Sequence, residues 1–326
     1  MTTYNLTATS LGGMLGALKT PTEMVNIISQ LANVNLWPTG SGTLKTVVEN
    51  TTGSYTLHGS GELFLFTGSN GDTATVTDSG GNILADPGNI NYIGSGGDTL
   101  IGGDGPTALT AAQGDNFFVA GTGLNTLTGG TGNDTMYGGG QSEMYGGSGN
   151  DIIHGGVSGG AMDTLYGSSG ADILGDFQGN NTYFAGSGLN TIWGGAGNDT
   201  MWGGGQTVIH LGDGDNVVHI GQTASSHDIV AAGSGNDLMG AAAGNNTFYT
   251  GTGNDTIWAG SGADTVAAGM TGNATIHGSG ATEIFSAQNE GDIKSQTSAG
   301  GFTTITFQDG QHIEFANATI HFTPKS

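Results

Sequence analysis

A spacing of nine residues governs the middle of the chain and limits what it can fold into. Between residue 93 and about residue 286, the sequence divides into repeats of the pattern G-G-x-G-x-D-x-U-x, where U is a large apolar residue. Clear copies begin at residues 129, 146, 167, 194, 250 and 259. Repetition this regular predicts a stack of similar structural repeats and not an ordinary globular domain.

Each repeat is expected to contain a tight turn followed by a short strand. The first six residues form the turn, because glycine adopts positive φ angles and leaves backbone carbonyl oxygens uncovered. The last three form a strand whose U side chain points inward while both neighbours point outward. Two repeats would then complete one coil, so the expected fold class is all-β.

The segment before the repeats has a more ordinary composition. We expect residues 1–92 to form a small N-terminal α+β segment that serves in docking or capping. A capping signal at Thr20 predicts one helix that continues until Pro38. Apolar runs at residues 62–66 and 73–77 predict short strands.

The repeat region and the C-terminal segment complete the chain. Residues 93–286 hold about 21 repeats. Residues 287–326 lose the period, and Phe302–Phe307 and His312–Phe315 flank a turn, which predicts a β-hairpin cap.

A longer period is superimposed on the nine-residue one. Residues 120–184 and 185–249 are each 65 residues long and divide identically into repeats of 9, 9, 8, 9, 12, 9 and 9 residues. This indicates an internal duplication. Because seven is odd and two repeats make one coil, each duplicated feature should reappear on the opposite side of the solenoid.

The charge of the chain requires a cationic partner. Its 27 acidic residues face four lysines and no arginine, for a net charge of -23, which excludes nucleic acid as a partner. Coils stack about 4.8 Å apart, so the sixth-position carboxylates would form columns that repel one another. Calcium fits best, because it takes six to eight oxygen ligands in irregular geometry, whereas magnesium demands an octahedron and zinc prefers histidine or thiolate.

These repeats resemble the RTX, or repeats-in-toxin, family of proteins that type I systems of Gram-negative bacteria secrete. The resemblance implies a parallel β-roll in which turn carbonyls and sixth-position aspartates bind several Ca²⁺ ions. On matching positions these are Asp98, Asp134, Asp151, Asp172, Asp199, Asp237, Asp255 and Asp264. Asp163 and Asp228 are expected to do the same inside the 12-residue repeats.

Several repeats depart from the pattern by placing a neutral side chain at the sixth position. The residues are Asn116, Asn125, Asn181, Asn190, Asn216 and Asn246. These turns either bind calcium weakly or close by side-chain hydrogen bonds without metal.

Secretion is expected from the resemblance and from the physics of the repeats. RTX relatives carry an uncleaved C-terminal export signal, and the last segment here could be that signal, a cap, or both. The first residues lack the basic region of a cleavable signal peptide, no stretch is long enough to cross a membrane, and cysteine is absent. Without calcium the acidic columns should keep the chain unfolded, so that millimolar external calcium confines folding to the outside of the cell.

Aromatic residues recur at the outward-pointing ninth position of the repeats. Such rows usually mark a contact surface, although flanking loops could cover them. The residues that we expect at an interface are Tyr137, Tyr145, Trp193, Trp202, Tyr249 and Trp258. His154, His210, His219 and His277 also occupy ninth positions, where a transition-metal site would need two or three of them to converge.

No arrangement of catalytic residues stands out, so we expect a protein that is not an enzyme. The leading hypothesis is a secreted calcium-binding structural protein that self-assembles into a surface layer, fibre or biofilm matrix, as RTX surface-layer proteins of some alphaproteobacteria do. A homo-oligomer or polymer is the expected partner state. The alternatives are an adhesin for a cell-surface glycan or for ice, the latter through Thr and Asn in the turns, and an accessory module of a secreted enzyme.

Overall fold

The computed structural model describes six short strands before residue 90 and then residues 90–323, apart from residues 95, 103–104, 157–159 and 270. The chain divides into two compact units, Met1–Ser148 and Gly149–Ser326, hereafter the first and second units. The helix predicted after Thr20 lies outside the described residues. No helix among those described is long and apolar enough to cross a membrane.

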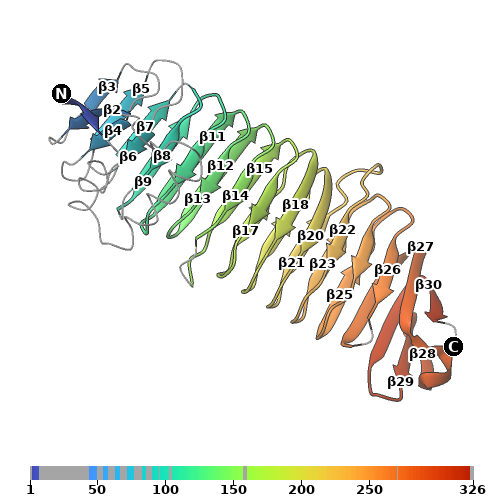
Figure 1. Cartoon of the computed structure of the whole chain (residues 1–326). Coiled ribbons are helices and arrows are strands. Elements are labelled where there is room, and N and C mark those ends of the chain that lie inside the picture. The colour runs from blue at the N-terminus through green and yellow to red at the C-terminus, as the bar shows by residue number, and fades with distance from the viewer. Residues whose placement is uncertain are drawn as a thin grey trace. The chain divides into compact units, whose positions relative to one another are not determined.

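The strands of the first unit alternate between two parallel ladders (Figure 1). One ladder contains β2 (Leu44–Glu49), β4 (Leu63–Phe66), β6 (Ile83–Ala85), β8 (Thr99–Ile101), β10 (Phe117–Val119) and β12 (Thr135–Tyr137). The other contains β3 (Ser54–Leu57), β5 (Asp72–Val76), β7 (Ile90–Gly94), β9 (Thr107–Ala111), β11 (Asn125–Thr131) and β13 (Ser142–Ser148).

Parallel pairing in the first unit begins well before the nine-residue period does. β1 (Thr2–Leu6) pairs antiparallel with β2, and from β2 onward the described strands pair in parallel. The strands predicted at residues 62–66 and 73–77 are present as β4 and β5. A boundary at residue 92 therefore stays a prediction.

The second unit has the same two-ladder design. Ladder A contains β14 (Ile152–His154), β16 (Ile173–Gly175), β18 (Leu189–Trp193), β20 (Gln206–His210), β22 (Ile229–Ala231), β24 (Thr247–Tyr249), β26 (Thr265–Ala268) and the second half of β27 (Asn273–Asn289). Ladder B contains β15 (Thr164–Ser169), β17 (Thr182–Phe184), β19 (Thr200–Trp202), β21 (Val217–Ile220), β23 (Leu238–Ala241), β25 (Asn254–Trp258) and the first half of β27.

The eighth residue of each repeat forms the core, as the alternation of side chains predicts. Tyr183 pairs with Met201 in the next coil, so two repeats complete one turn of the solenoid. Both side chains are fully buried, as are Ile192 and Ile209 on the opposite ladder. The predicted all-β parallel solenoid is confirmed, and the described residues contain one short 3₁₀ helix, Glu290–Asp292.

The duplicated halves occupy opposite sides, as the odd number of repeats predicts. The 12-residue repeat of the first copy ends in β15, which lies in ladder B. Its counterpart ends in β22, which lies in ladder A.

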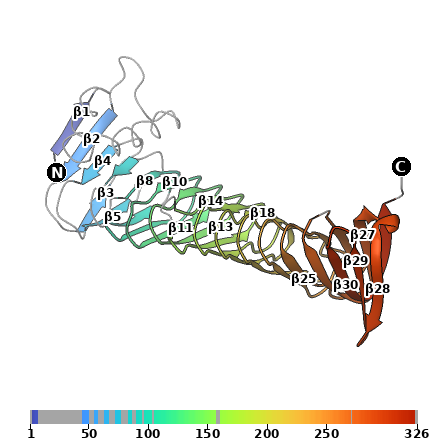
Figure 2. The same cartoon turned by 90° about the horizontal axis from the view of Figure 1, so that it is seen from below.

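The C-terminal strands close the last coil of the second unit (Figure 2). β29 (Phe302–Phe307) and β30 (His312–Thr323) form the predicted hairpin, and β28 (Ile293–Ala299) adds a third antiparallel strand. β30 also pairs in parallel with β27 along both ladders. Within this cap, the side chains of Ile305, Phe307 and Ile313 are buried.

Candidate metal centres

The sixth-position aspartates lie at the corners between turn and strand, inside the solenoid wall. Each is at most 3 % exposed, although an ionised carboxylate is costly to bury without a partner. The structure buries every aspartate that the sequence analysis named as a ligand: Asp98, Asp134, Asp151, Asp163, Asp172, Asp199, Asp228, Asp237, Asp255 and Asp264.

One oxygen of these carboxylates holds neighbouring coils together. The backbone N–H of the sixth-position residue in one coil donates to Oδ1 of the sixth-position residue in the next. Asp172 Oδ1 accepts from Asp151 at 2.8 Å, and Asp199 Oδ1 accepts from Asn181 at 2.7 Å. The first unit contains the same type of hydrogen bond, in which Asp134 Oδ1 accepts the backbone N–H of Asn116 at 2.8 Å.

The second carboxylate oxygen is buried without a hydrogen bond at several corners. Oδ2 has no hydrogen-bond partner in Asp172, Asp199, Asp237 and Asp264. A buried charged oxygen left in this state is strongly unfavourable. These four atoms are therefore the candidate ligands of a cation.

At two of these corners, a glycine and a backbone carbonyl lie beside the unpartnered carboxylate oxygen. A Cβ placed on Gly167 would lie 2.6 Å from Asp172 Oδ2 and 2.5 Å from the Ala185 carbonyl oxygen of the next coil. A Cβ on Gly194 would lie 2.9 Å from Asp199 Oδ2 and would clash with a carbonyl oxygen of the next coil. Glycine thus keeps open a cradle whose donors are all oxygens, as a hard cation such as Ca²⁺ prefers.

Comparison with known families agrees with this geometry. Four stretches of the chain, residues 110–142, 143–174, 177–207 and 240–270, match the RTX calcium-binding nonapeptide repeat (4 copies). The solenoid is an RTX β-roll. RTX nonapeptide repeats bind Ca²⁺ at multiple sites, so calcium is its cofactor. No curated protein matches the chain.

In the RTX β-roll, burial disfavours the ionised form of the sixth-position aspartates. Burial raises the pKa of Asp199 to about 7 and that of Asp237 to about 6. Burial also raises the pKa of Asp172 and Asp264, although hydrogen bonds from neighbouring backbone N–H groups oppose the rise. A cation bound at these corners would favour the ionised carboxylates and so oppose the effect of burial.

Where the sixth position holds asparagine, as at Asn116 and Asn216, the side-chain amide forms hydrogen bonds with the turn. The side-chain N–H group of Asn116 donates to the Gly114 carbonyl at 2.6 Å, and that of Asn216 donates to the Gly214 carbonyl at 3.0 Å. The amide therefore bonds to the turn carbonyls that would otherwise face a cation. This is the pattern of turns that close without metal.

Three of the predicted ligand aspartates have different surroundings from the others, because their Oδ2 accepts a backbone N–H. The donor is Gly156 for Asp163 at 2.8 Å, Gly221 for Asp228 at 2.9 Å, and Gly251 for Asp255 at 3.0 Å. All three carboxylates remain buried, and their role as calcium ligands stays a prediction.

A second ladder, which the sequence analysis missed, runs along the exposed fifth positions. The Asn198 N–H donates to Asn180 Oδ1 at 2.8 Å, and the Asp215 N–H donates to Asn198 Oδ1 at 2.9 Å. Asn236 and Asn254 continue it. In this ladder the N–H of the later coil donates to the earlier coil, whereas in the sixth-position ladder the N–H of the earlier coil donates to the later one. The Asn-Asp pair that recurs at the fifth and sixth positions of the repeats could have predicted this second ladder.

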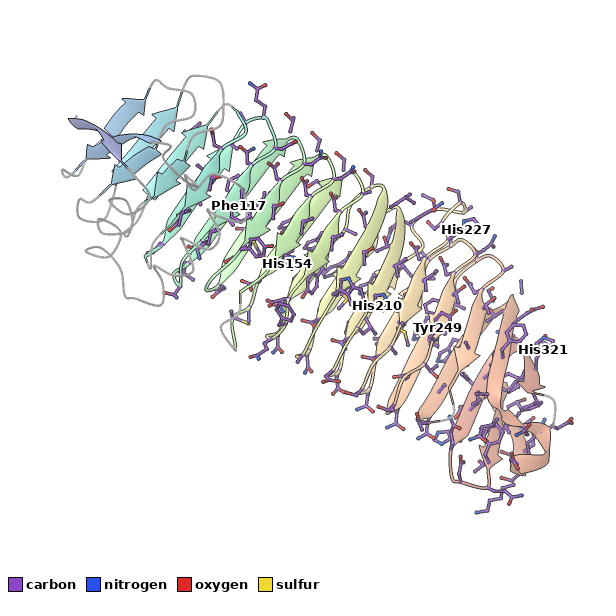
Figure 3. All side chains as sticks on the ribbon, viewed as in Figure 1. Phe117, His154, His210, His227, Tyr249 and His321 are labelled. Carbon is purple, nitrogen blue, oxygen red and sulfur yellow. The ribbon has the colours of Figure 1, made fainter. Side chains whose placement is uncertain are left out.

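Stacked rings cover part of the outer surface of the second unit. On ladder B, Tyr166, Phe184 and Trp202 stack with ring centroids 4.8 and 4.6 Å apart. On ladder A, Trp193 stacks on His210 at 3.9 Å. His210 and Tyr249 both lie on the outside of ladder A (Figure 3).

The predicted interface residues differ in exposure. Tyr137, Trp193, Tyr249 and Trp258 are between 38 % and 53 % exposed. Tyr145, which donates to Glu143, and Trp202, which lies within its stack, are partly covered. Among the described residues, no three His, Cys, Asp or Glu side chains are arranged to hold a metal ion.

Proposed function

We propose that the chain is a secreted, calcium-binding structural protein that folds outside the cell and assembles with copies of itself into a surface layer, fibre or matrix. The observation that carries this proposal is the combination of buried carboxylates that need Ca²⁺ with rows of exposed aromatic rings on both ladders.

The need for calcium would explain why the chain folds only outside the cell. The corners at Asp172, Asp199, Asp237 and Asp264 each contain a buried carboxylate oxygen without a hydrogen-bond partner. Cytoplasmic calcium is far lower than extracellular calcium, so the acidic corners repel until the chain reaches the outside. An RTX β-roll with this chemistry is suited to export in an unfolded state.

The aromatic rows supply a contact surface. Trp193 on ladder A and Trp258 on ladder B are about half exposed, on opposite sides of the second unit. Tryptophan in such positions is typical of protein interfaces. Similar rings on two opposite faces allow each copy to contact two neighbours, which is the requirement for a sheet or fibre.

Electron microscopy of the purified chain tests the assembly. We expect ordered sheets or filaments in millimolar calcium, none in EGTA, and none with the double variant Trp193→Ala and Trp258→Ala. The control variant Thr191→Ala removes an outward side chain from the same strand as Trp193 and should assemble normally. Dispersed monomers of the native chain in calcium would contradict the proposal.

A second candidate function, glycan binding, is supported by a repeated gap beside each exposed tryptophan. Along the outside of ladder A, the paired residues are His154, Gly175 and Trp193 in successive coils. Gly175 has no side chain, which leaves a gap between Trp193 and His154; a Cβ there would lie 3.4 Å from Trp193 Cβ and 3.9 Å from His154 Nδ1. A flat sugar ring could stack there.

The same arrangement recurs 65 residues later on ladder B, where Gly240 lies between His219 and Trp258. A Cβ on Gly240 would meet only one atom within 4 Å. Titration of soluble polysaccharides, followed by tryptophan fluorescence, tests this function. Binding by calcium-loaded monomers that is lost in the double variant Gly175→Leu and Gly240→Leu would support it, and no fluorescence change would contradict it.

A further inference from the structure

Asp176 departs from the repeat pattern in a way that creates a different kind of site. It occupies the first position of its repeat, where the pattern has glycine. It also lies between two matched stretches, 143–174 and 177–207. Its side chain is 5 % exposed, so a second acidic residue is buried at this corner of the β-roll.

The carboxylate of Asp176 points at that of Asp163 in the preceding coil. A Cβ on Gly155 would clash with Asp176 Oδ2 and lie 2.8 Å from Asp163 Oδ2, so both oxygens face one point. Asp176 Oδ1 accepts the Phe177 N–H at 2.6 Å, while its Oδ2 has no hydrogen-bond partner. Asp163 Oδ2 also accepts the Gly156 N–H at 2.8 Å.

Nothing in the surrounding sequence can neutralise this pair. Between residues 149 and 293 the chain has no lysine or arginine. Two buried carboxylates in contact must share a proton or bind a cation, because both cannot remain charged and bare.

The second copy of the duplication lacks the same pair. Asp228 corresponds to Asp163, but Ile220 replaces Gly155 and Ala241 replaces Asp176. Ile220 is 1 % exposed, so an apolar side chain occupies the position that glycine leaves open in the first copy. The chain thus contains an acidic and an apolar version of one corner.

We infer that Asp163 and Asp176 together hold one Ca²⁺ ion through two carboxylates, more tightly than corners with a single carboxylate. This inference rests on the proposed calcium binding. Two negative charges at one site favour a divalent cation more than one does, and ligand charge is a main determinant of calcium affinity. The corner at Asp228, which has one carboxylate and a buried isoleucine, should not bind with this affinity.

Calcium titration by calorimetry tests the loss of the site. Asp176→Asn keeps the Oδ1 acceptor but removes the charge, and should weaken the tightest binding step roughly tenfold or more. The double variant Gly155→Ile and Asp176→Ala copies the second corner, and should fold in calcium while binding one ion fewer.

Transplanting the site provides the converse test. The double variant Ile220→Gly and Ala241→Asp should gain one tight calcium ion, whereas Ala241→Asp alone should not. Native binding that is unchanged in Asp176→Asn, with a shared proton detected at the pair, would overturn this inference and leave calcium binding elsewhere intact. A native chain that binds no calcium would instead refute the proposed function itself.

Discussion

At the scale of single residues, sixth-position aspartates such as Asp199 use their two oxygens differently. Asp199 Oδ1 accepts a backbone N–H from the neighbouring coil, and Oδ2 faces a cradle of oxygens. Asn216 Oδ1 also accepts a backbone N–H, while its N–H group bonds the turn carbonyl. We therefore expect the choice between Asp and Asn to decide whether a corner binds metal.

The variant Asp199→Asn separates the uses of the two oxygens. It should bind one Ca²⁺ ion fewer, yet the metal-free β-roll should become more stable by about 1–3 kcal/mol, because an unpaired buried oxygen is removed. Calorimetry measures calcium binding, and circular dichroism in EGTA measures the fraction of the metal-free chain that folds, which should be larger in Asp199→Asn. Asp199→Ala is the control, since it also loses the hydrogen bond from Asn181 and should be less stable than Asp199→Asn. Equal calcium stoichiometry in Asp199→Asn and the native chain would refute this assignment.

The raised carboxylate pKa values predict an inverted pH dependence for the metal-free chain. The pKa values in the folded state, about 7 for Asp199 and about 6 for Asp237, exceed the ordinary value of 3.8. The folded state therefore holds more protons, and its stability is present at low pH and lost as pH rises through these values. Thermal unfolding in EGTA should show a melting temperature that falls between about pH 4 and pH 8. In calcium the fall should largely vanish, and a melting temperature that rises with pH in EGTA would contradict the account.

The sequence predicted which aspartates lie at the corners of the solenoid, because the repeat fixes their position, and the structure buries them there. That they bind metal stays a prediction. The sequence did not predict how each oxygen is used, since that depends on the register between coils. Asp228 and Asp172 occupy equivalent places in the pattern, yet only Asp228 Oδ2 finds a backbone N–H. The role of Asp176 was missed because its partner, Asp163, lies in another coil.

At the scale of elements, the C-terminal strands end the solenoid by covering its last coil. β30 pairs with β27, and β29 and β28 follow as antiparallel strands. The open edge of a parallel ladder would otherwise invite pairing with any other chain. Phe307 is fully buried under this cap and contacts Phe322.

The variant Phe307→Ala should loosen the cap. Removal of a buried phenylalanine costs about 3–5 kcal/mol. Because coils in a repeat protein contact only their neighbours, the loss should be confined to the cap and the last coils. Hydrogen exchange should show faster exchange in β27 to β30 and little change in β16 to β20. Phe285→Ala, which removes a 45 % exposed ring from β27, should have little effect. Uniformly faster exchange throughout the second unit would contradict local coupling.

The hairpin was predicted from its apolar runs and its turn, whereas β28 was not. Its sequence, IKSQTSA, is polar and almost entirely exposed, so no pattern marks it as a strand. Its position depends on pairing with β29, a contact that a sequence of this composition does not reveal. The parallel pairing from β2 onward was missed for a similar reason, because those coils lack the glycine period.

At the scale of the whole molecule, a net charge of -23 opposes compaction, and the apolar core is only one or two residues wide in each strand. Each coil buries two large side chains and two or more polar corners, so burial alone leaves the carboxylates uncompensated. Calcium bound at the corners reverses that balance, because it binds the folded chain and not the unfolded one. Folding and metal binding should therefore be a single coupled event.

Circular dichroism of the purified chain at neutral pH, recorded in EGTA and again after millimolar calcium is restored, tests this coupling most directly. The account predicts a largely unfolded spectrum in EGTA, a β-rich spectrum in calcium, and no recovery when magnesium replaces calcium. A β-rich spectrum in EGTA with the same thermal unfolding as in calcium would contradict it.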